Sequence, residues 1–327
     1  LISRGVRTAD GIGKLWNTEG ALGGPLAKDK LWFFGSGRNF VLDTLPANTF
    51  YGQEGTGSAF VAPTPTTEKG VDPQSIRSVQ ARITWQLSQK NKLAVYNDRL
   101  LKNRGSAMTA GFDPRTAGIV WNSPIYTTGS VKFTSTATSR IFVETGFSTN
   151  FERYNTRYQP GLEKDRTDPL WYSVINRTDS SRGTAWGAGS TNQGMYPDSL
   201  ALMASVSYVT GSHAMKVGLQ MMEGWLLTSQ SLNNIPGLGP VSYTFRNGSP
   251  VSLTEWRSPY GFPTHLSPAL GLYAQDQWTM KKLTLNLGLR FDMDRDYALA
   301  TTLKGIPEFG IADLSFPESH DSRSEEH

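Results

Sequence analysis

Strict alternation of apolar and polar residues, interrupted by very short turns, recurs along this chain. The clearest case is the run Gly271–Trp278, the turn Thr279–Lys282, and the second run Leu283–Asp292. A period of two places alternate side chains on opposite faces of an extended strand. In the second run, Leu283, Leu285, Leu287, Leu289 and Phe291 share one face, and Thr284, Asn286, Gly288, Arg290 and Asp292 share the other.

The sequence predicts four more hairpins of this kind, and therefore about ten strands in five hairpins. Their turns contain Gly, Asn, Lys, Thr and Ser, residues that are common in hairpin turns. The four pairs of strands, each with its turn, are Asn17–Pro25, Leu26–Lys30 and Leu31–Val41; Ile76–Leu87, Ser88–Asn91 and Lys92–Leu101; Thr128–Ala137, Thr138–Ser139 and Arg140–Phe151; and Leu200–Val209, Thr210–His213 and Ala214–Leu227.

Long polar segments separate one hairpin from the next: 42–74, 102–127, 152–199 and 228–268. Loops of this length without structure are uncommon inside compact soluble domains. Short turns on one side and long loops on the other are typical of a membrane β-barrel with periplasmic turns and extracellular loops. Inside the last segment, Val241–Arg246 and Val251–Trp256 flank an Asn-Gly-Ser-Pro turn, which we interpret as strand extensions or a small hairpin above the bilayer.

The polar faces of the predicted strands carry charges that would not suit a dry core. We expect them to form the inner wall of an antiparallel, up-and-down transmembrane barrel, with the aromatic residues beside the short turns forming a girdle. Alternation by itself also fits a soluble all-β protein with one solvated face per sheet, and the asymmetry of turns and loops favours the membrane. The wall residues are Arg82, Lys132, Glu144, Lys216 and Arg290, and the girdle residues are Trp32, Phe33, Phe34, Trp85 and Trp278.

Two acidic residues interrupt the apolar faces. Glu223 falls on the face of Met215 and Met221, and Asp276 falls on the face of Leu272 and Ala274. We expect either that each of these residues lies beyond the hydrocarbon layer of the membrane, or that a β-bulge shifts the register of its strand.

Composition excludes several classes of protein. The chain of 327 residues has no Cys, which rules out disulfides and thiolate chemistry. Its net charge of +4 comes from scattered Lys and Arg, so no nucleic-acid partner is expected. No run of 18 apolar residues predicts a transmembrane helix. We expect residues 1–297 to form part of a barrel and 298–327 to be a disordered loop or tail, within a piece of a longer protein.

Several segments resemble barrel hairpins of TonB-dependent outer-membrane receptors, and most closely those of the Oar-like group. The similarity extends from about residue 17 to residue 297, in the same order. The segments are Gly23-Gly24-Pro25-Leu26-Ala27-Lys28-Asp29-Lys30-Leu31-Trp32-Phe33-Phe34-Gly35, Arg82–Leu87 with Lys90–Leu93, His213–Gly218, Tyr273–Trp278 and Leu285–Asp292.

The resemblance implies part of a 22-stranded plugged barrel in a bacterial outer membrane, in contact with membrane lipid. Such a receptor captures a scarce small ligand (a siderophore, saccharide or peptide) with its loops after residues 41, 101, 151 and 227. TonB supplies the energy through a plug domain that is not among these residues. The alternatives are an adhesin or a structural barrel without transport, and a barrel hydrolase.

We expect no enzyme and no catalytic, cofactor or metal site. His213, in a short turn, and His265, in a long loop, are predicted at opposite ends, so they form no dyad. Asp292, Asp294 and Asp296 lack the Gly and Glu of a calcium loop and predict a charged strand end. The long loops contain six aromatic residues, for which we expect one of two roles: stacking on a sugar or apolar ligand, or packing the loops against each other. These residues are Tyr51, Trp121, Trp171, Tyr172, Trp186 and Trp256.

Overall fold

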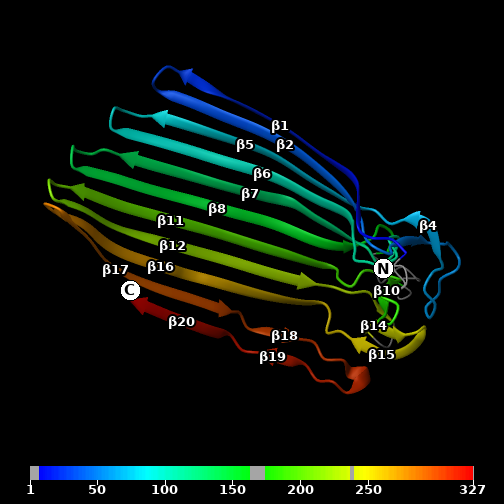
Figure 1. The fold of residues 1–327 in the computed structure, drawn as a ribbon. Coiled ribbons are helices and arrows are strands. Elements are labelled where there is room, and N and C mark those ends of the chain that lie inside the picture. Colours follow the sequence, from blue (N-terminus) through cyan, green and yellow to red (C-terminus); the bar gives the residue numbers. More distant parts are fainter. Residues whose placement is uncertain (1–6, 163–173, 236–238, 327) are drawn as a thin grey trace.

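The computed structural model describes residues 7–162, 174–235 and 239–326, and its main element is one antiparallel sheet of eleven strands (Figure 1). Each strand pairs with the next long strand of the chain, as in an up-and-down barrel. The strands are β1 (Gly11–Ala27), β2 (Leu31–Leu45), β5 (Asp72–Gln86), β6 (Asn91–Ala107), β7 (Ile119–Ser135), β8 (Ile141–Tyr158), β11 (Gln193–Val209), β12 (His213–Gln230), β16 (Tyr260–Met280), β17 (Leu283–Ala298) and β20 (Ser319–Glu326).

The all-β fold and the five predicted hairpins are confirmed, and the strands are longer than expected. Figure 1 shows the short turns together at one end of the sheet, which we call the turn end, and the long connections at the other, the loop end. At about 3.4 Å per residue and a tilt of about 40°, a 17-residue strand rises about 44 Å, beyond the roughly 25 Å apolar band of such barrels. The loops therefore begin later than predicted, after residues 45, 107, 158 and 230.

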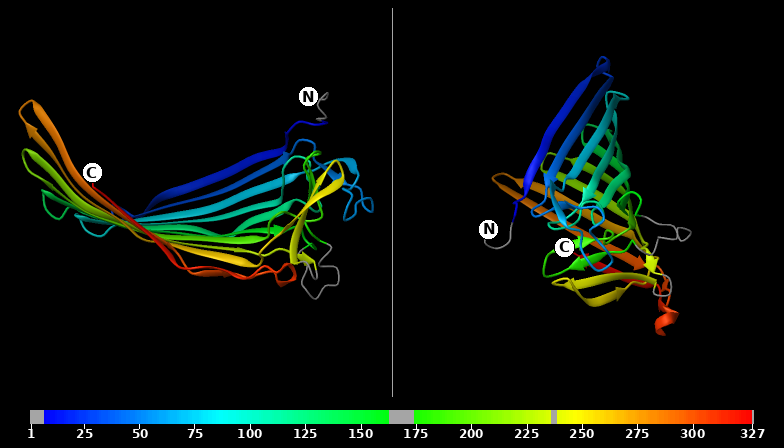
Figure 2. Two further views of the ribbon diagram at one scale, coloured as in Figure 1. Left: turned by 90° about the horizontal axis from the view of Figure 1, so that it is seen from below. Right: turned by 90° about the vertical axis from the view of Figure 1, so that its right-hand side faces the viewer.

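The sheet is bent and open. Figure 2 shows β1 along one edge and β17 and β20 along the other, and no pairing among the residues that the structure describes joins the two edges. β20 covers only part of β17, from Phe291 to Ala298. The eleven strands therefore form a curved wall.

A smaller group of strands stands over the loop end, and we call it the loop-end cap. Its four-strand path has the order β10-β9-β14-β13, β15 pairs with β14, and β3 and β4 form a separate pair. The predicted hairpin around Asn247 and Gly248 is β14 and β15, with both turn residues at positive φ, as a type I′ turn requires. The bounds are β3 (Phe50–Gly52), β4 (Pro65–Lys69), β9 (Arg177–Asp179), β10 (Thr184–Trp186), β13 (Asn234–Ile235), β14 (Gly239–Arg246) and β15 (Ser249–Glu255).

The buried apolar side chains gather at the loop end. Among the described residues they include Trp186 and Phe245 in the cap and Tyr158 at the end of β8. The apolar face of the main sheet is exposed instead, with 77% of Leu289, 70% of Leu22 and 67% of Val79 open to the surroundings. A face this apolar requires an apolar environment.

Within the described ranges, no helix has the length and apolar character needed to cross a membrane.

Residues 298–327, for which we expected a disordered loop or tail, contain regular structure. They form β18 (Thr301–Leu303), the 3-10 helix η3 (Pro307–Phe309), β19 (Leu314–Phe316) and β20. The charged sequence of β20 gives no apolar alternation, and the strand forms because the edge of β17 offers unpaired backbone groups. Pairing at an edge depends on the neighbouring strand, which local sequence does not reveal.

Candidate functional site

The five predicted wall residues share the polar face of the main sheet. Cross-strand pairing connects Glu144 to Ser205, Ser205 to Gly218, Gly218 to Tyr273, and Tyr273 to Arg290. Directly paired residues point to the same side of a sheet. The same reasoning places Lys132 and Lys216 on this face, and Arg82 joins it through its pairing with Tyr96.

Ion pairs hold part of this wall in place. Lys132 and Glu144 form a salt bridge between β7 and β8. Arg290 is held by the Asp292 carboxylate, with Nε 2.7 Å and Nη2 2.6 Å from its oxygens, and it donates to Gln220 Oε1 at 3.4 Å. The guanidinium lies over Gly271, where a Cβ would come within 2.5 Å of Nη2.

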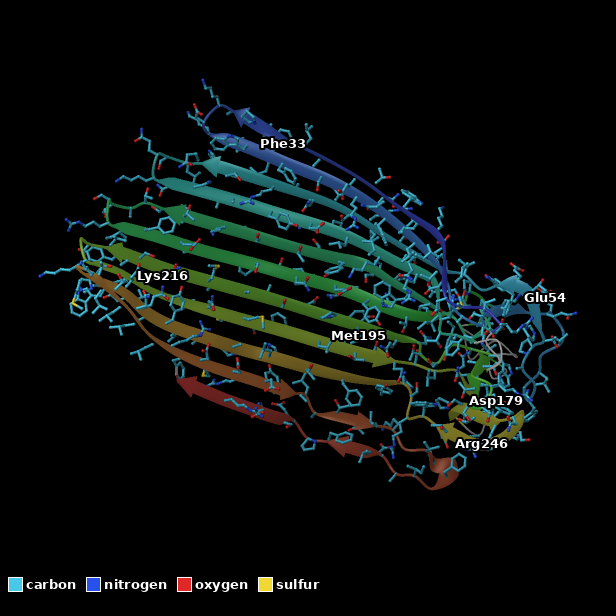
Figure 3. All side chains as sticks on the ribbon, in the orientation of Figure 1. Phe33, Glu54, Asp179, Met195, Lys216 and Arg246 are labelled. Atoms are coloured by element: carbon cyan, nitrogen blue, oxygen red, sulfur yellow. The ribbon has the colours of Figure 1, made fainter. Side chains whose placement is uncertain are left out.

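Two hollows lie along this polar face. One of about 540 Å³ is lined by Lys132, Gln220, Arg290 and Asp292, together with small residues and larger apolar residues such as Met203 and Met222. A second, of about 370 Å³, places Lys216 beside Arg290, and Figure 3 shows Lys216 on the β12 strand. Arg82 lies on β5, two strands from Lys132 on β7, and it lines neither hollow. The structure therefore joins four of the five predicted residues into a charged, hydrophilic surface and leaves Arg82 apart.

The loop-end cap contains a pocket of about 530 Å³. Aromatic and guanidinium groups line it: Phe60, Trp186, Tyr243, Arg115 and Arg177. The Arg177 guanidinium lies 5.9 Å from the centre of the Tyr243 ring, and Trp186 packs on Phe245 with ring centres 5.1 Å apart. Such a pocket can hold an aromatic or anionic group through stacking and charge-assisted hydrogen bonds.

Polar contacts fix the pocket walls. The buried Asp113 accepts hydrogen bonds from the Gly52 amide at 3.2 Å and from the Thr116 hydroxyl at 2.6 Å. Arg115 pairs with Glu54 at 2.8 Å, at the exposed rim that Glu54 marks in Figure 3. Burial lowers the pKa of Arg177, and the nearby Tyr243 acts in the opposite direction. The Asp113–Gly52 and Arg115–Glu54 contacts each join residues that are 61 positions apart in the sequence.

Asp179 ties two parts of the cap together. Its buried carboxylate accepts backbone hydrogen bonds from Ser181 at 3.0 Å, Arg182 at 3.2 Å, Asn247 at 3.2 Å and Gly248 at 2.6 Å. Burial alone would raise the pKa of Asp179, but these donors outweigh it and lower the pKa. Asp179 therefore links the turn between β9 and β10 to the turn between β14 and β15 (Figure 3).

Sequence reasoning did not find Asp113, Arg177 and Asp179, because each also contacts a residue that is distant in the chain: Gly52, Tyr243 and Gly248, respectively. The sequence indicated the Asn-Gly turn, but it did not indicate that the amides of this turn donate to the Asp179 carboxylate. Of the predicted loop aromatics, Trp186 is a packing residue, and Tyr51 lies under Arg115 at 5.5 Å. The others have different positions: Trp121 packs against Tyr154 with tilted rings, Trp256 donates to Ser242, and Trp171 and Tyr172 lie outside the described residues.

The two histidines lie at opposite ends of the sheet, as predicted, although His265 is in β16 and not in a loop. His265 Nε2 is 3.2 Å from Glu223 Oε1, and its Nδ1 contacts the Tyr297 hydroxyl. The nearby Ser267 hydroxyl donates to Glu223 at 3.1 Å. Both ring nitrogens of His265 therefore face groups other than the serine, which is not the arrangement of an activated nucleophile.

The three aspartates of the predicted charged strand end all lie in β17. The Asp292 carboxylate forms an ion pair with Arg290. In the backbone ladder between β17 and β20, Asp294 lies opposite Arg323, and Asp296 lies opposite Asp321.

Residues 38–301 match the family model described as outer membrane beta barrel domain. No curated protein matches the sequence. The fold is also similar to solved outer-membrane structures at low sequence identity. The ferric yersiniabactin uptake receptor FyuA from Yersinia pestis has a TM-score of 0.58 at 11% identity. The matched region covers 97% of this chain and 42% of the FyuA chain.

Two Escherichia coli proteins are similar to the same degree. The outer membrane transporter YddB has a TM-score of 0.54 at 12% identity, with 90% of this chain covering 39% of that one. The ferric-catecholate import receptor Fiu, in its open form, has a TM-score of 0.53 at 13% identity, with 97% covering 50%. The chain therefore spans half the length of these proteins or less, and the similarity defines the fold.

Proposed function

The chain belongs to the outer membrane beta barrel domain family, and from this premise we propose that it forms part of the wall of a TonB-dependent receptor and transporter. We further propose that this receptor is of the Oar-like group and has no enzymatic activity. The rest of the barrel and the plug, through which TonB would act, belong to segments outside these eleven strands. An outer-membrane barrel of this family places its apolar face against lipid and its polar face toward the lumen.

The two unlike faces of the main sheet are the observation that carries this proposal. The apolar face is exposed, and the polar face holds the Lys132–Glu144 and Arg290–Asp292 ion pairs beside open hollows. A structural barrel without transport needs only the apolar face that contacts lipid. Charged groups of both signs along a hydrated wall also let a polar solute exchange hydrogen bonds as it moves.

In the proposed mechanism, the loop-end cap captures the ligand and the polar face guides it. The pocket between Phe60, Arg115 and Tyr243 offers ring faces and guanidinium donors. Siderophores, saccharides and peptides all carry groups that such surfaces bind. TonB-driven movement of the plug would then open the path along Lys132, Lys216 and Arg290.

Uptake by intact cells tests the proposal. Cells that produce the complete gene product are supplied with labelled ferric siderophores, saccharides or peptides in limiting amounts. We expect uptake of one class to require both this gene and TonB, while binding at the cell surface persists without TonB. Binding that never leads to TonB-dependent uptake would indicate an adhesin, and equal uptake without the gene would refute the proposal.

Two pocket variants locate the capture site. Arg115→Ala and Phe60→Ala should each weaken binding about tenfold, the effect of a moderate interface contact. Trp256→Ala is the matched control, because this aromatic residue of the cap does not line the pocket. Equal affinity of all three variants would place capture elsewhere. The hydrolase alternative predicts loss of an esterase activity in His265→Ala.

A further inference from the structure

The two acidic residues that interrupt the apolar face belong to the same structural motif. Asp276 and Trp278 are two positions apart on β16, and Glu223 and Trp225 are two positions apart on β12. A histidine lies directly opposite each tryptophan on the neighbouring strand: His213 pairs with Trp278, and His265 pairs with Trp225. At the turn end of the antiparallel strands β12 and β16 (Figure 1), β16 supplies the acid and the tryptophan and β12 supplies the histidine; at the loop end, the two strands have the opposite roles.

The contacts at the turn end hold the Asp276 carboxylate on the apolar face. His213 Nδ1 lies 2.6 Å from Asp276 Oδ2. The His213 ring also stacks on Trp278, with ring centres 5.3 Å apart and planes inclined by 16°. Asp276 is in register with Met215 and Leu287, so apolar neighbours flank it on both sides.

The contacts at the loop end repeat this arrangement. His265 Nε2 lies 3.2 Å from Glu223 Oε1, and the His265 ring stacks on Trp225 at 5.1 Å with an inclination of 18°. A bulge in β16 makes this contact possible, since β12 advances two residues from Met222 to Gly224 while β16 advances three. The extra residue brings His265 to the same face as Trp225.

The spacing of the two clusters corresponds to the thickness of a bilayer. Asp276 is level with Met215, and Met215 to Glu223 covers about 27 Å along the strand, or about 21 Å vertically at a tilt of about 40°. The tryptophan levels, at His213 and Trp225, are about 31 Å apart vertically by the same reasoning. The apolar band of such barrels is about 25 Å tall.

We propose that these two acid–histidine–tryptophan clusters bind the headgroup layers of the two leaflets and fix the depth of this wall in the membrane. Each band edge falls between the carboxylate and its tryptophan. The carboxylate is tolerated there because its histidine shields it from the acyl chains, and the ring pair occupies the amphipathic layer where tryptophan is stable. The partner is a lipid surface, and the inference does not depend on the transported ligand.

Depth measurements on spin-labelled cysteine variants test this placement. These 327 residues contain no Cys, so single substitutions along β12 can be labelled specifically once any Cys in the other segments of the complete gene product has been replaced. The complete gene product is placed in vesicles of outer-membrane lipid, and collisions with oxygen are compared with collisions with a water-soluble nickel chelate. Oxygen should dominate for labels at Val217, Leu219 and Met221, and the nickel chelate should dominate for labels at Gly211 and Leu227. A band that extends past Leu227, or that ends between Val217 and Met221, would overturn the proposal.

A double substitution tests whether the loop-end cluster sets that edge. Replacing Glu223 and His265 with Leu should shift the edge outward by about one pair of residues, or about 5 Å, to a level between Trp225 and Leu227, so that the ratio of oxygen to nickel-chelate collisions rises at the Leu227 label. The control Glu223→Gln with His265→Gln keeps polar groups and should leave the profile unchanged. A label at Gln220, on the polar face, reports whether the sheet is folded. An unchanged edge in the folded Leu variant would refute the anchoring role, and if that variant does not fold, the profile of the parent protein decides the matter.

Discussion

Removing the Asp179 carboxylate should release the loop-end cap while the main sheet stays intact. In Asp179→Ala, four backbone amides lose their common acceptor. A hydrogen bond to a charged group contributes about 1.5–3 kcal/mol, and an unpaired buried donor costs about 1–3 kcal/mol. Water partly replaces the acceptor in a cap this close to the surface, so we expect a total loss of about 3–5 kcal/mol and not the sum of four bonds.

Hydrogen exchange at the four amides measures this loss directly. A loss of about 3 kcal/mol corresponds to exchange more than about 100-fold faster, up to the rate of the fully open cap. Strands β11 and β12 should keep their protection, because Asp179 does not contact them. Exchange within about threefold of the parent protein would refute the idea that this carboxylate holds the cap.

Asp313→Ala is the matched control for that experiment. Asp313 also accepts a backbone amide, from Gly305 at 2.7 Å, but its side chain is about half exposed. Its pKa is lowered by this amide and by Lys304. Substitution there should leave exchange in the cap within about threefold, as is usual for surface positions.

The pKa of Asp179 adds a dependence on pH with a defined sign. Because the folded pKa lies below the unfolded value of about 3.9, the stabilisation is fully present above about pH 4 and is lost as the pH falls through the folded pKa. The protection of the parent cap amides, meaning their exchange rate relative to that of an unstructured amide at the same pH, should therefore fall only below about pH 4. Asp179→Asn should have weaker protection at neutral pH and no further loss across that acidic range, and a parent protection that already falls at about pH 6 would contradict the assignment.

Two further predictions concern the faces of the main sheet. Val217→Arg, on the apolar face, should lower the free energy of unfolding in lipid vesicles by about 2–4 kcal/mol, whereas Gln220→Glu on the polar face, which keeps the acceptor that Arg290 uses, should change it little; equal losses would contradict the assignment of the faces. Gly218→Ala should cost about 1–3 kcal/mol in the same assay, because the added Cβ would lie 2.5 Å from the Tyr273 hydroxyl, while Gly20→Ala, with nothing within 4 Å, is the neutral control.

Local periodicity was sufficient to predict ten of the eleven strands of the main sheet, and β20 was the exception. Alternation from Leu283 to Asp292 sets the faces of β17, and the short turns fix which strands are neighbours. The wall residues Lys132, Glu144 and Arg290 could be assigned to one face for the same reason, since side chains in a strand alternate with a period of two. The exact strand ends could not be predicted, because they depend on pairing beyond the bilayer and not on hydrophobicity.

The sequence by itself determined two unlike faces and their order along the chain, because these follow from a pattern between nearest neighbours. The asymmetry of short turns and long loops, also visible in the sequence, indicated the membrane as the environment. Only the tertiary structure showed that Asp179 holds Gly248, that β20 pairs with β17, and that Glu223 and Asp276 each have a histidine partner. These contacts join residues that are far apart in the chain. Which distant groups meet depends on register and on bulges such as the one in β16, and these are settled by the pairing of whole strands.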